Sequence, residues 1–206
     1  MKVEEFVMMK NTLESIFESV QKNTELQESE VKDIFVDEGF FSELGYDGFG
    51  VDIRSEETIR GNERADYSAK DSLGNTVFII EFKKPSNDKD LAHDDYKNQL
   101  WNQYVKPLKA DYGILTDGQE IILYERKSRD QRNRLFRNSL SNITDGESND
   151  LTKLTKPSYE FSTKTELTDY LDSLESVSIG KMVDGVDVGQ KEFISNFGNK
   201  EGTIFY

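Results

Sequence analysis

Apolar side chains recur at three- and four-residue steps through the first twenty positions of the chain, which is the spacing of an amphipathic helix. The residues that carry this pattern are Phe6, Met9, Leu13, Ile16, Phe17 and Val20. A second helix is predicted over about 29–38, with Ser29 or Thr24 as its N-cap. The glycine-rich stretch 45–50 then predicts a turn that leads into a short strand near 51–54.

A different pattern, dense in β-branched, aromatic and aliphatic residues, covers 77–82 and predicts a buried strand. Pro85 follows the run, and proline cannot continue a central ladder. Residues 65–70 predict the preceding strand, because the turn-forming residues 71–75 separate the two segments. Together these segments predict an antiparallel hairpin.

The next segments predict a helix followed by a second hairpin. Residues from about 91 to 108 predict the helix, and 112–116 and 120–125 predict two strands. Asp117-Gly118 lies between these strands and is a strong signal for a tight turn. Asp117 is therefore expected to be a turn residue rather than a ligand.

The last third of the chain is less regular. Residues 138–165 are rich in Ser, Asn, Asp, Thr and Lys and predict a long loop or lid, while 165–177 predicts a helix. The organisation we expect is an N-terminal helix packed on a core (1–27), the core itself (28–137), and an extension of loop, helix and glycines that leads to further domains (138–206).

Charged residues end the strand 77–82. Side chains alternate between the two faces of a strand, so Glu81 and Lys83 share a face. If the hairpin loop is even-numbered and centred between positions 73 and 74, paired positions sum to 147 and Asp66 lies opposite Glu81. Opposed residues have Cβ atoms roughly 4.5–5.5 Å apart. The register therefore predicts two neighbouring carboxylates beside a lysine.

Two carboxylates placed together repel, and a divalent cation removes that penalty. Mg²⁺ favours carboxylate and water oxygens, and Mn²⁺ is expected to substitute for it. Beside such an ion, Lys83 would hold a water or offset developing negative charge. The alternative is that the acid-x-lysine pattern has no chemistry, because such tripeptides are common and many strands end in charges that reach solvent.

Asp66, Glu81 and Lys83 match, in order, the catalytic acid, acid and lysine of the PD-(D/E)xK nuclease superfamily, which this chain resembles. More narrowly, it resembles the N-terminal endonuclease domain of type I restriction enzyme motor (R) subunits and related single-chain restriction enzymes. Ala65 replaces the usual proline before the first acid. The resemblance implies an α/β, restriction-endonuclease-like core, with a mixed central β-sheet flanked by helices, and Mg²⁺-dependent hydrolysis of DNA phosphodiesters.

Flanking positions extend the resemblance. The predicted helix near 29–38 is similar to the family's first helix, where an acid often joins the metal site, and we choose Glu30 for that role with Glu28 as the alternative. The backbone carbonyl of Ile80 is a further candidate metal ligand. Gln99 matches the first residue of a Gln-x-x-x-Tyr signature, although the tyrosine falls one place late. Only Gln99 is therefore carried over, as an auxiliary residue.

Charge complicates a DNA-binding function. The chain has a formal net charge of −14, whereas phosphate contacts need Lys and Arg. A local basic segment is the exception, and two readings of it stay open: a grip on the DNA backbone or another domain, and a solvated loop. Its residues are Arg126, Lys127, Arg129, Arg132, Arg134 and Arg137.

Length and composition set further bounds. With 206 residues, 35% of them hydrophobic, the chain can bury one substantial core. It contains no cysteine, no apolar run of membrane-spanning length and no secretory signal pattern, so no membrane association is expected and a cytoplasmic location fits.

The sequence also bounds the partners. No Gly-x-x-x-x-Gly-Lys-Ser/Thr motif occurs in the 206 residues, so ATP is expected only if a motor domain exists outside this chain. DNA and other domains or subunits of a restriction-modification complex are the expected partners. A competing hypothesis is a non-catalytic nuclease-fold domain used for protein docking or DNA binding. The acidity favours this hypothesis, and the intact acid-acid-lysine set argues against it.

Overall fold

A six-stranded sheet organises the chain, with its strands in the order β1-β2-β3-β4-β5-β6. The computed structural model describes residues 3–23, 25–60, 63–85, 89–128 and 130–157. The strands are β1 Ile53–Arg60, β2 Glu63–Lys70, β3 Thr76–Phe82, β4 Tyr112–Thr116, β5 Glu120–Arg126 and β6 Arg132–Ser139.

Neighbouring strands are antiparallel except for β3 and β4, which are parallel. Parallel neighbours need a crossover connection, and here it is helical. It consists of α4 Asp94–Asn98, a π-helical segment η1 Gln99–Val105, and α5 Lys106–Leu108. The predicted α/β class with a mixed central sheet flanked by helices is confirmed.

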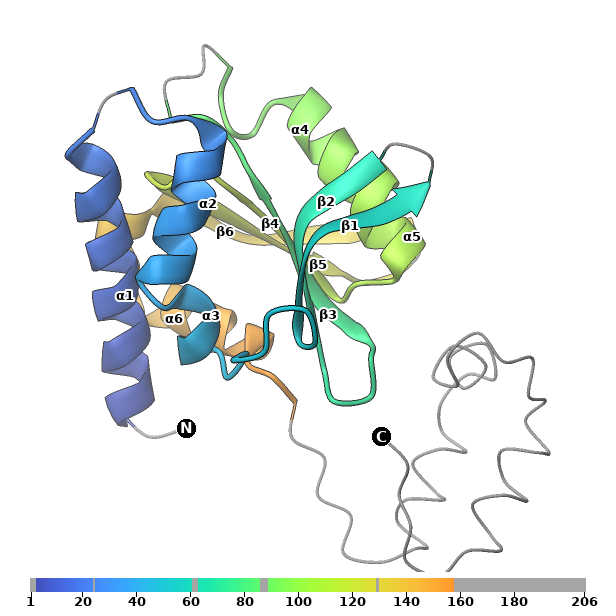
Figure 1. Ribbon diagram of the computed structural model, residues 1–206, viewed down its shortest axis with the longest axis horizontal. Coiled ribbons are helices and arrows are strands. Elements are labelled where there is room, and N and C mark those ends of the chain that lie inside the picture. The colour runs from blue at the N-terminus through green and yellow to red at the C-terminus, as the bar shows by residue number, and fades with distance from the viewer. Residues whose placement is uncertain (1–2, 24, 61–62, 86–88, 129, 158–206) are drawn as a thin grey trace, which may run out of the picture. The chain divides into compact units, whose positions relative to one another are not determined.

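Helices cover both faces of the sheet (Figure 1). One face carries α1 Val3–Gln21, α2 Glu28–Asp37, α3 Phe40–Glu43 and α6 Asp145–Leu151. The short 3-10 turns η2 Leu140–Asn142 and η3 Thr152–Leu154 flank α6. The crossover α4–η1–α5 lies on the other face. None of the helices in the described ranges has the length and apolar character needed to span a membrane.

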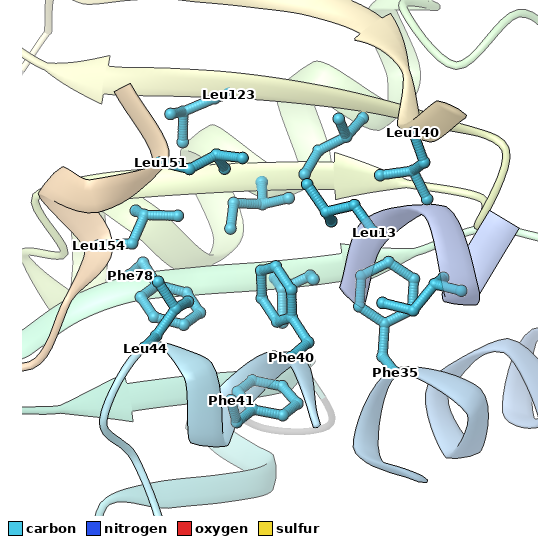
Figure 2. Packing of buried hydrophobic residues seen from close by; sticks show 14 of the residues in the cluster. Leu13, Phe35, Phe40, Phe41, Leu44, Phe78, Leu123, Leu140, Leu151 and Leu154 are labelled. Atoms are coloured by element: carbon cyan, nitrogen blue, oxygen red, sulfur yellow. The ribbon is translucent and has the colours of Figure 1, made fainter. Parts of the chain in front are cut away.

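The larger hydrophobic core fills the space between α1–α3, α6 and the sheet (Figure 2). Phe35 packs edge-on against Phe40 and Phe82, with ring centroids 5.3 and 4.9 Å apart. The buried Tyr46 hydroxyl donates a hydrogen bond of 2.9 Å to the Leu154 carbonyl, which ties the end of the described chain to this core. Edge-to-face aromatic pairs add about 0.5–1.5 kcal/mol each to what burial alone contributes.

Near the carboxylates, the β2–β3 hairpin has the register that the sequence predicts. Its loop, however, differs in length from the predicted one. Tyr67 pairs with Ile80, as the sum of 147 requires, whereas Lys70 pairs with Thr76 at the loop. The loop is therefore odd-numbered, and a β-bulge at Val77 restores the expected pairing.

Several elements differ from the sequence-based expectations. The first strand is longer and later than the predicted 51–54, and the basic segment contains strand β6 rather than a loop. The long loop predicted over 138–165 is wrong for 140–154, which folds into η2, α6 and η3 because apolar residues there join the larger core. The predicted helix 165–177 and the glycine-containing tail lie outside the described residues.

The N-cap of α2 also differs. Gln27 takes that position, not Ser29, while Thr24 lies outside the described residues. Glu30 forms part of a capping box at the start of α2, because its Oε2 accepts a hydrogen bond of 2.7 Å from the Gln27 backbone N–H.

Candidate active site

Asp66 on β2 and Glu81 on β3 are brought to opposed positions by the hairpin register, one step beyond the pair Tyr67–Ile80. Asp66 is fixed by its strand neighbour, since its Oδ2 accepts a hydrogen bond of 2.7 Å from the Phe82 backbone N–H. A side-chain carboxylate thus occupies the place of the next ladder partner. The charge of Asp66 contributes to raising the pKa of Glu81.

Glu81 is the most deeply buried carboxylate of the site, with 4% of its side chain exposed. Its Oε1 accepts a hydrogen bond of 2.7 Å from Lys83 Nζ, while its Oε2 is buried and has no partner among the described residues. Burial, and next the charge of Asp66, raise the pKa of Glu81 to about 7 even though Lys83 opposes the shift. A buried carboxylate oxygen without a partner is costly in a folded chain.

Lys83 is positioned by the crossover as well as by its own strand. It is 10% exposed at the side chain, and its Nζ also donates to Gln99 Oε1 at 3.3 Å. Gln99 in turn donates from Nε2 to the Tyr104 hydroxyl at 2.9 Å. The ammonium group lies 5.1 Å from the ring centroid of Tyr96, within cation–π range.

The π-helix η1 accounts for the tyrosine that falls one place late in sequence. A π-helix bonds i to i+5, so it places residues five apart on one side, where an α-helix places residues four apart. Gln99 and Tyr104 are five apart and hydrogen-bonded. The sequence pattern carries over Gln99 alone, whereas in the structure Gln99 contacts Lys83 and is itself hydrogen-bonded to Tyr104.

A glycine on β4 allows η1 to lie close to the sheet. A Cβ atom at Gly113 would approach Val105 Cγ2 to 2.9 Å and Leu100 Cδ2 to 3.1 Å, which is closer than side chains normally pack. The smaller hydrophobic core, which includes Trp101 and Tyr104, forms at this contact. The absence of a side chain at Gly113 therefore helps to set the position of Gln99.

A second lysine reaches the site from α2. Lys32 Nζ lies 2.5 Å from Asp66 Oδ1 and 3.5 Å from Glu28 Oε1. Burial lowers the pKa of Lys32, but the hydrogen bond and charge of Asp66 together with Glu28 outweigh it, so the pKa is raised. Nothing in the local sequence pattern linked Lys32 to Asp66, because the contact joins two elements that are distant along the chain.

The two acids considered on α2 have different surroundings. Glu30, our choice from sequence, is exposed and serves the helix cap through Gln27. Glu28 lies on the turn of Lys32 and contributes to raising the pKa of Glu81. The structure thus brings Glu28, not Glu30, toward Asp66 and Glu81. Glu28 and Lys32 are four residues apart, so they lie on the same side of α2.

The backbone ligand candidate also changes. Alternate residues of a strand direct their backbone groups to the same neighbour, and the Phe82 N–H points to β2. The Ile80 carbonyl therefore faces its ladder partner Tyr67 and is used in sheet pairing. The Phe82 carbonyl is the better candidate, because it lies beyond the last ladder pair on the side of Asp66.

The donor set fits a hard divalent cation. Within the described ranges, no group of three or more acidic or histidine side chains is already arranged around one ion position. Asp66 and Glu81 do lie at opposed positions of neighbouring strands, and Glu81 Oε2 is buried with no donor among the described residues. Carboxylate oxygens of this kind are the ligands that Mg²⁺ and Mn²⁺ favour.

A strained residue borders the site. In the β1–β2 ladder Ser55 pairs with Tyr67 and Glu57 with Ala65, so Glu56 lies opposite Asp66. Glu56 has φ of 50°, a left-handed conformation that is unfavourable for a residue with a side chain.

Two of the basic residues predicted to contact DNA are used within the fold. Arg126 donates to the Ala110 carbonyl at 2.7 Å. Arg137 forms ion pairs with Asp90 at 3.0 Å and with Glu120 at 2.6 Å. These arginines stabilise the sheet edge and its neighbours rather than presenting free charges.

The other basic residues are more accessible. Arg132 is exposed and lies 5.9 Å from the ring centroid of Trp101. Arg134 is exposed and forms no ion pair within the described part of the chain, and Lys127 forms a 2.6 Å ion pair with an acidic neighbour on β5. Arg129 lies outside the described residues.

Comparison with protein families matches residues 27–143 to the type I restriction enzyme R protein N terminus (HSDR_N). The chain belongs to this family. The match begins at Gln27, the residue that caps α2, and ends at Ile143, just after η2. The HSDR_N region thus contains both carboxylates, both lysines and the π-helix described above.

Among solved structures, the chain is similar to one described as a cryoEM structure of a DrdV-DNA complex. The sequences are 20% identical, the TM-score is 0.49, and the alignment covers 76% of this chain and 14% of that chain. The chain therefore spans a small part of the length of that protein. No curated protein matches the chain significantly.

Proposed function

We propose that this HSDR_N domain is a Mg²⁺-dependent endonuclease that hydrolyses DNA phosphodiesters within a type I or related restriction enzyme. The observation that carries the proposal is that Asp66 lies opposite Glu81, whose buried Oε2 has no donor among the described residues, beside the anchored Lys83. Two acids on adjacent strands beside a lysine form an unfavourable arrangement that has a chemical use if a cation binds there.

Each residue has a role in this proposal. Asp66 and Glu81 would hold the ion, with Mn²⁺ as a substitute, and the Phe82 carbonyl would be a backbone ligand. The ion would supply Lewis-acid stabilisation of charge on the scissile phosphate. Lys83 Nζ, held by Gln99, would donate a hydrogen bond to the attacking water or to a phosphate oxygen. Tyr104 acts through Gln99 and is a positioning residue.

DNA contact would need basic residues that the fold leaves accessible. Arg132 and Arg134 on β6 are the candidates in the described part of the chain, since Arg126 and Arg137 are committed to internal contacts. The net charge of −14 implies that other domains or subunits of a restriction-modification complex supply most of the DNA affinity. ATP would act only through a motor domain outside this chain, and we expect a cytoplasmic location.

The direct test is cleavage of supercoiled plasmid in Mg²⁺ by the chain and by its assembled enzyme. Asp66→Ala, Glu81→Ala and Lys83→Ala should each reduce cleavage at least about 100-fold, the typical cost of removing one transition-state contact. Glu18→Ala, an exposed acid on α1, is the matched control and should leave cleavage unchanged. Melting curves establish that each variant is folded. Full activity in all three site variants would refute the proposal.

One observation favours a second candidate, a non-catalytic nuclease-fold domain for protein docking or DNA binding. Lys32 already neutralises Asp66, so the chain needs no metal to balance that charge. The two candidates differ in Mn²⁺ binding measured by calorimetry: the endonuclease requires binding that Glu81→Ala abolishes, whereas the docking domain requires none.

A further inference from the structure

The ammonium group of Lys32 takes up a carboxylate oxygen that a cation at this site would need. Lys32 Nζ lies 2.5 Å from Asp66 Oδ1, and Asp66 Oδ2 is already used by the Phe82 N–H. Both oxygens of Asp66 therefore have donors. Glu81 differs, because its Oε2 has none in the described chain.

We propose that Lys32 is a built-in competitor for the divalent cation: it neutralises Asp66 in the metal-free chain and must leave Oδ1 before an ion can bind there. This inference rests on the proposed function, since it concerns the regulation of the same site. The chain would consequently bind metal weakly until Lys32 is displaced.

The formal charges support displacement rather than simultaneous binding. Asp66, Glu81 and Glu28 carry three negative charges, and Lys32 and Lys83 carry two positive ones. A divalent ion added beside both lysines leaves an excess positive charge, whereas an ion that replaces Lys32 leaves the group neutral. Because like charges at close range repel strongly in a partly buried site, the second arrangement is favoured.

The two lysines differ in how readily each can leave. Lys83 is 10% exposed at the side chain and is anchored by Glu81 and Gln99. Lys32 is 21% exposed, and its flexible stem comes from α2, so its ammonium group can turn toward water while the helix stays in place.

The test is calorimetric titration of Mn²⁺ into the 206-residue chain and its Lys32→Met variant. We expect roughly tenfold tighter binding in Lys32→Met, because the ion no longer competes with an ammonium group. Lys22→Met removes the same charge from an exposed position after α1, and its affinity should stay within about twofold of the native chain. Lys32→Gln is the second variant in case Lys32→Met does not fold.

Two further measurements locate the effect. Glu81→Ala should abolish binding both alone and in the Lys32→Met background. Without metal, Lys32→Met should melt below the native chain, since Asp66 loses its partner, and saturating Mn²⁺ should remove that difference.

The outcomes separate this inference from the proposed function. Native binding with equal or weaker affinity in Lys32→Met would overturn the competitor role and leave the metal site standing. No binding in any variant, or binding that survives Glu81→Ala, would overturn both. Binding seen only in Lys32→Met and lost with Glu81→Ala would be the strongest support for both.

Discussion

The two acid–lysine pairs of the site are both direct ion pairs, but they differ in burial and in the elements that supply their residues. Glu81 is in β3 and Lys83 follows that strand directly, both are buried, and one Glu81 carboxylate oxygen has no donor among the described residues. Asp66 and Lys32 come from different elements, are more exposed, and satisfy both carboxylate oxygens.

These differences in burial and bonding indicate which ion pair is held more firmly. The Glu81–Lys83 pair lies at the end of the central strand β3 and is supported by Gln99 from the crossover, so several contacts hold it in place. The Asp66–Lys32 pair joins strand β2 to helix α2, and the flexible Lys32 side chain can turn toward solvent. A cation site formed by both acids is therefore rigid on the side of Glu81 and adjustable on the side of Asp66.

Neutralising each acid in turn should give the largest difference in folding stability between the two pairs. At pH 8 without metal, Glu81→Gln should stabilise the chain by up to about 3 kcal/mol, because an acid with its pKa raised to about 7 ionises there at a cost. Asp66→Asn should destabilise it by about 1–2 kcal/mol, since Lys32 and the Phe82 N–H lose a charged acceptor. Denaturant unfolding measures both.

The effect of Glu81 on folding stability depends on pH, because its pKa differs between the folded and the unfolded chain. The folded-state pKa of Glu81 is raised above its value in the unfolded chain, so its favourable contribution is complete below about pH 4.5 and is lost as pH rises through about 7. The advantage of Glu81→Gln should therefore disappear at pH 4. An advantage that persists at pH 4 would contradict the assignment.

A smaller effect on folding stability is expected at Tyr104, which holds Lys83 only indirectly, through Gln99. Tyr104→Phe removes the acceptor of the Gln99 amide and should cost about 0.5–1.5 kcal/mol of stability. If Tyr104 positions Lys83 through Gln99, cleavage should fall by a modest factor in kcat with little change in KM. A change in KM alone would point to a DNA-contact role instead.

Sequence predicted the rigid pair and not the adjustable one. Glu81 and Lys83 follow from alternation along a single strand, and Asp66 follows from pairing across one hairpin. That pairing holds even though the loop is odd-numbered, because the bulge at Val77 compensates. Lys32 could not be predicted, since its contact depends on how α2 packs against the sheet.

The crossover and the far sheet edge show two other limits. An α-helical reading of 91–108 cannot place Tyr104 beside Gln99, because the π-helix changes the spacing of facing residues from four to five. Strand β6 has few apolar residues and many charges, as edge strands often do, so its composition resembles a loop. In both segments tertiary packing, rather than local pattern, decides the structure.

The central claim is that Asp66 and Glu81 hold one divalent cation, and the position of bound Mn²⁺ tests it most directly. Crystals of the chain grown with Mn²⁺ should show an anomalous diffraction peak in contact with Glu81 Oε2 and Asp66, with Lys32 turned away from Asp66. A peak elsewhere, or Lys32 still bound to Asp66 at saturating Mn²⁺ with no peak between the acids, would contradict the account.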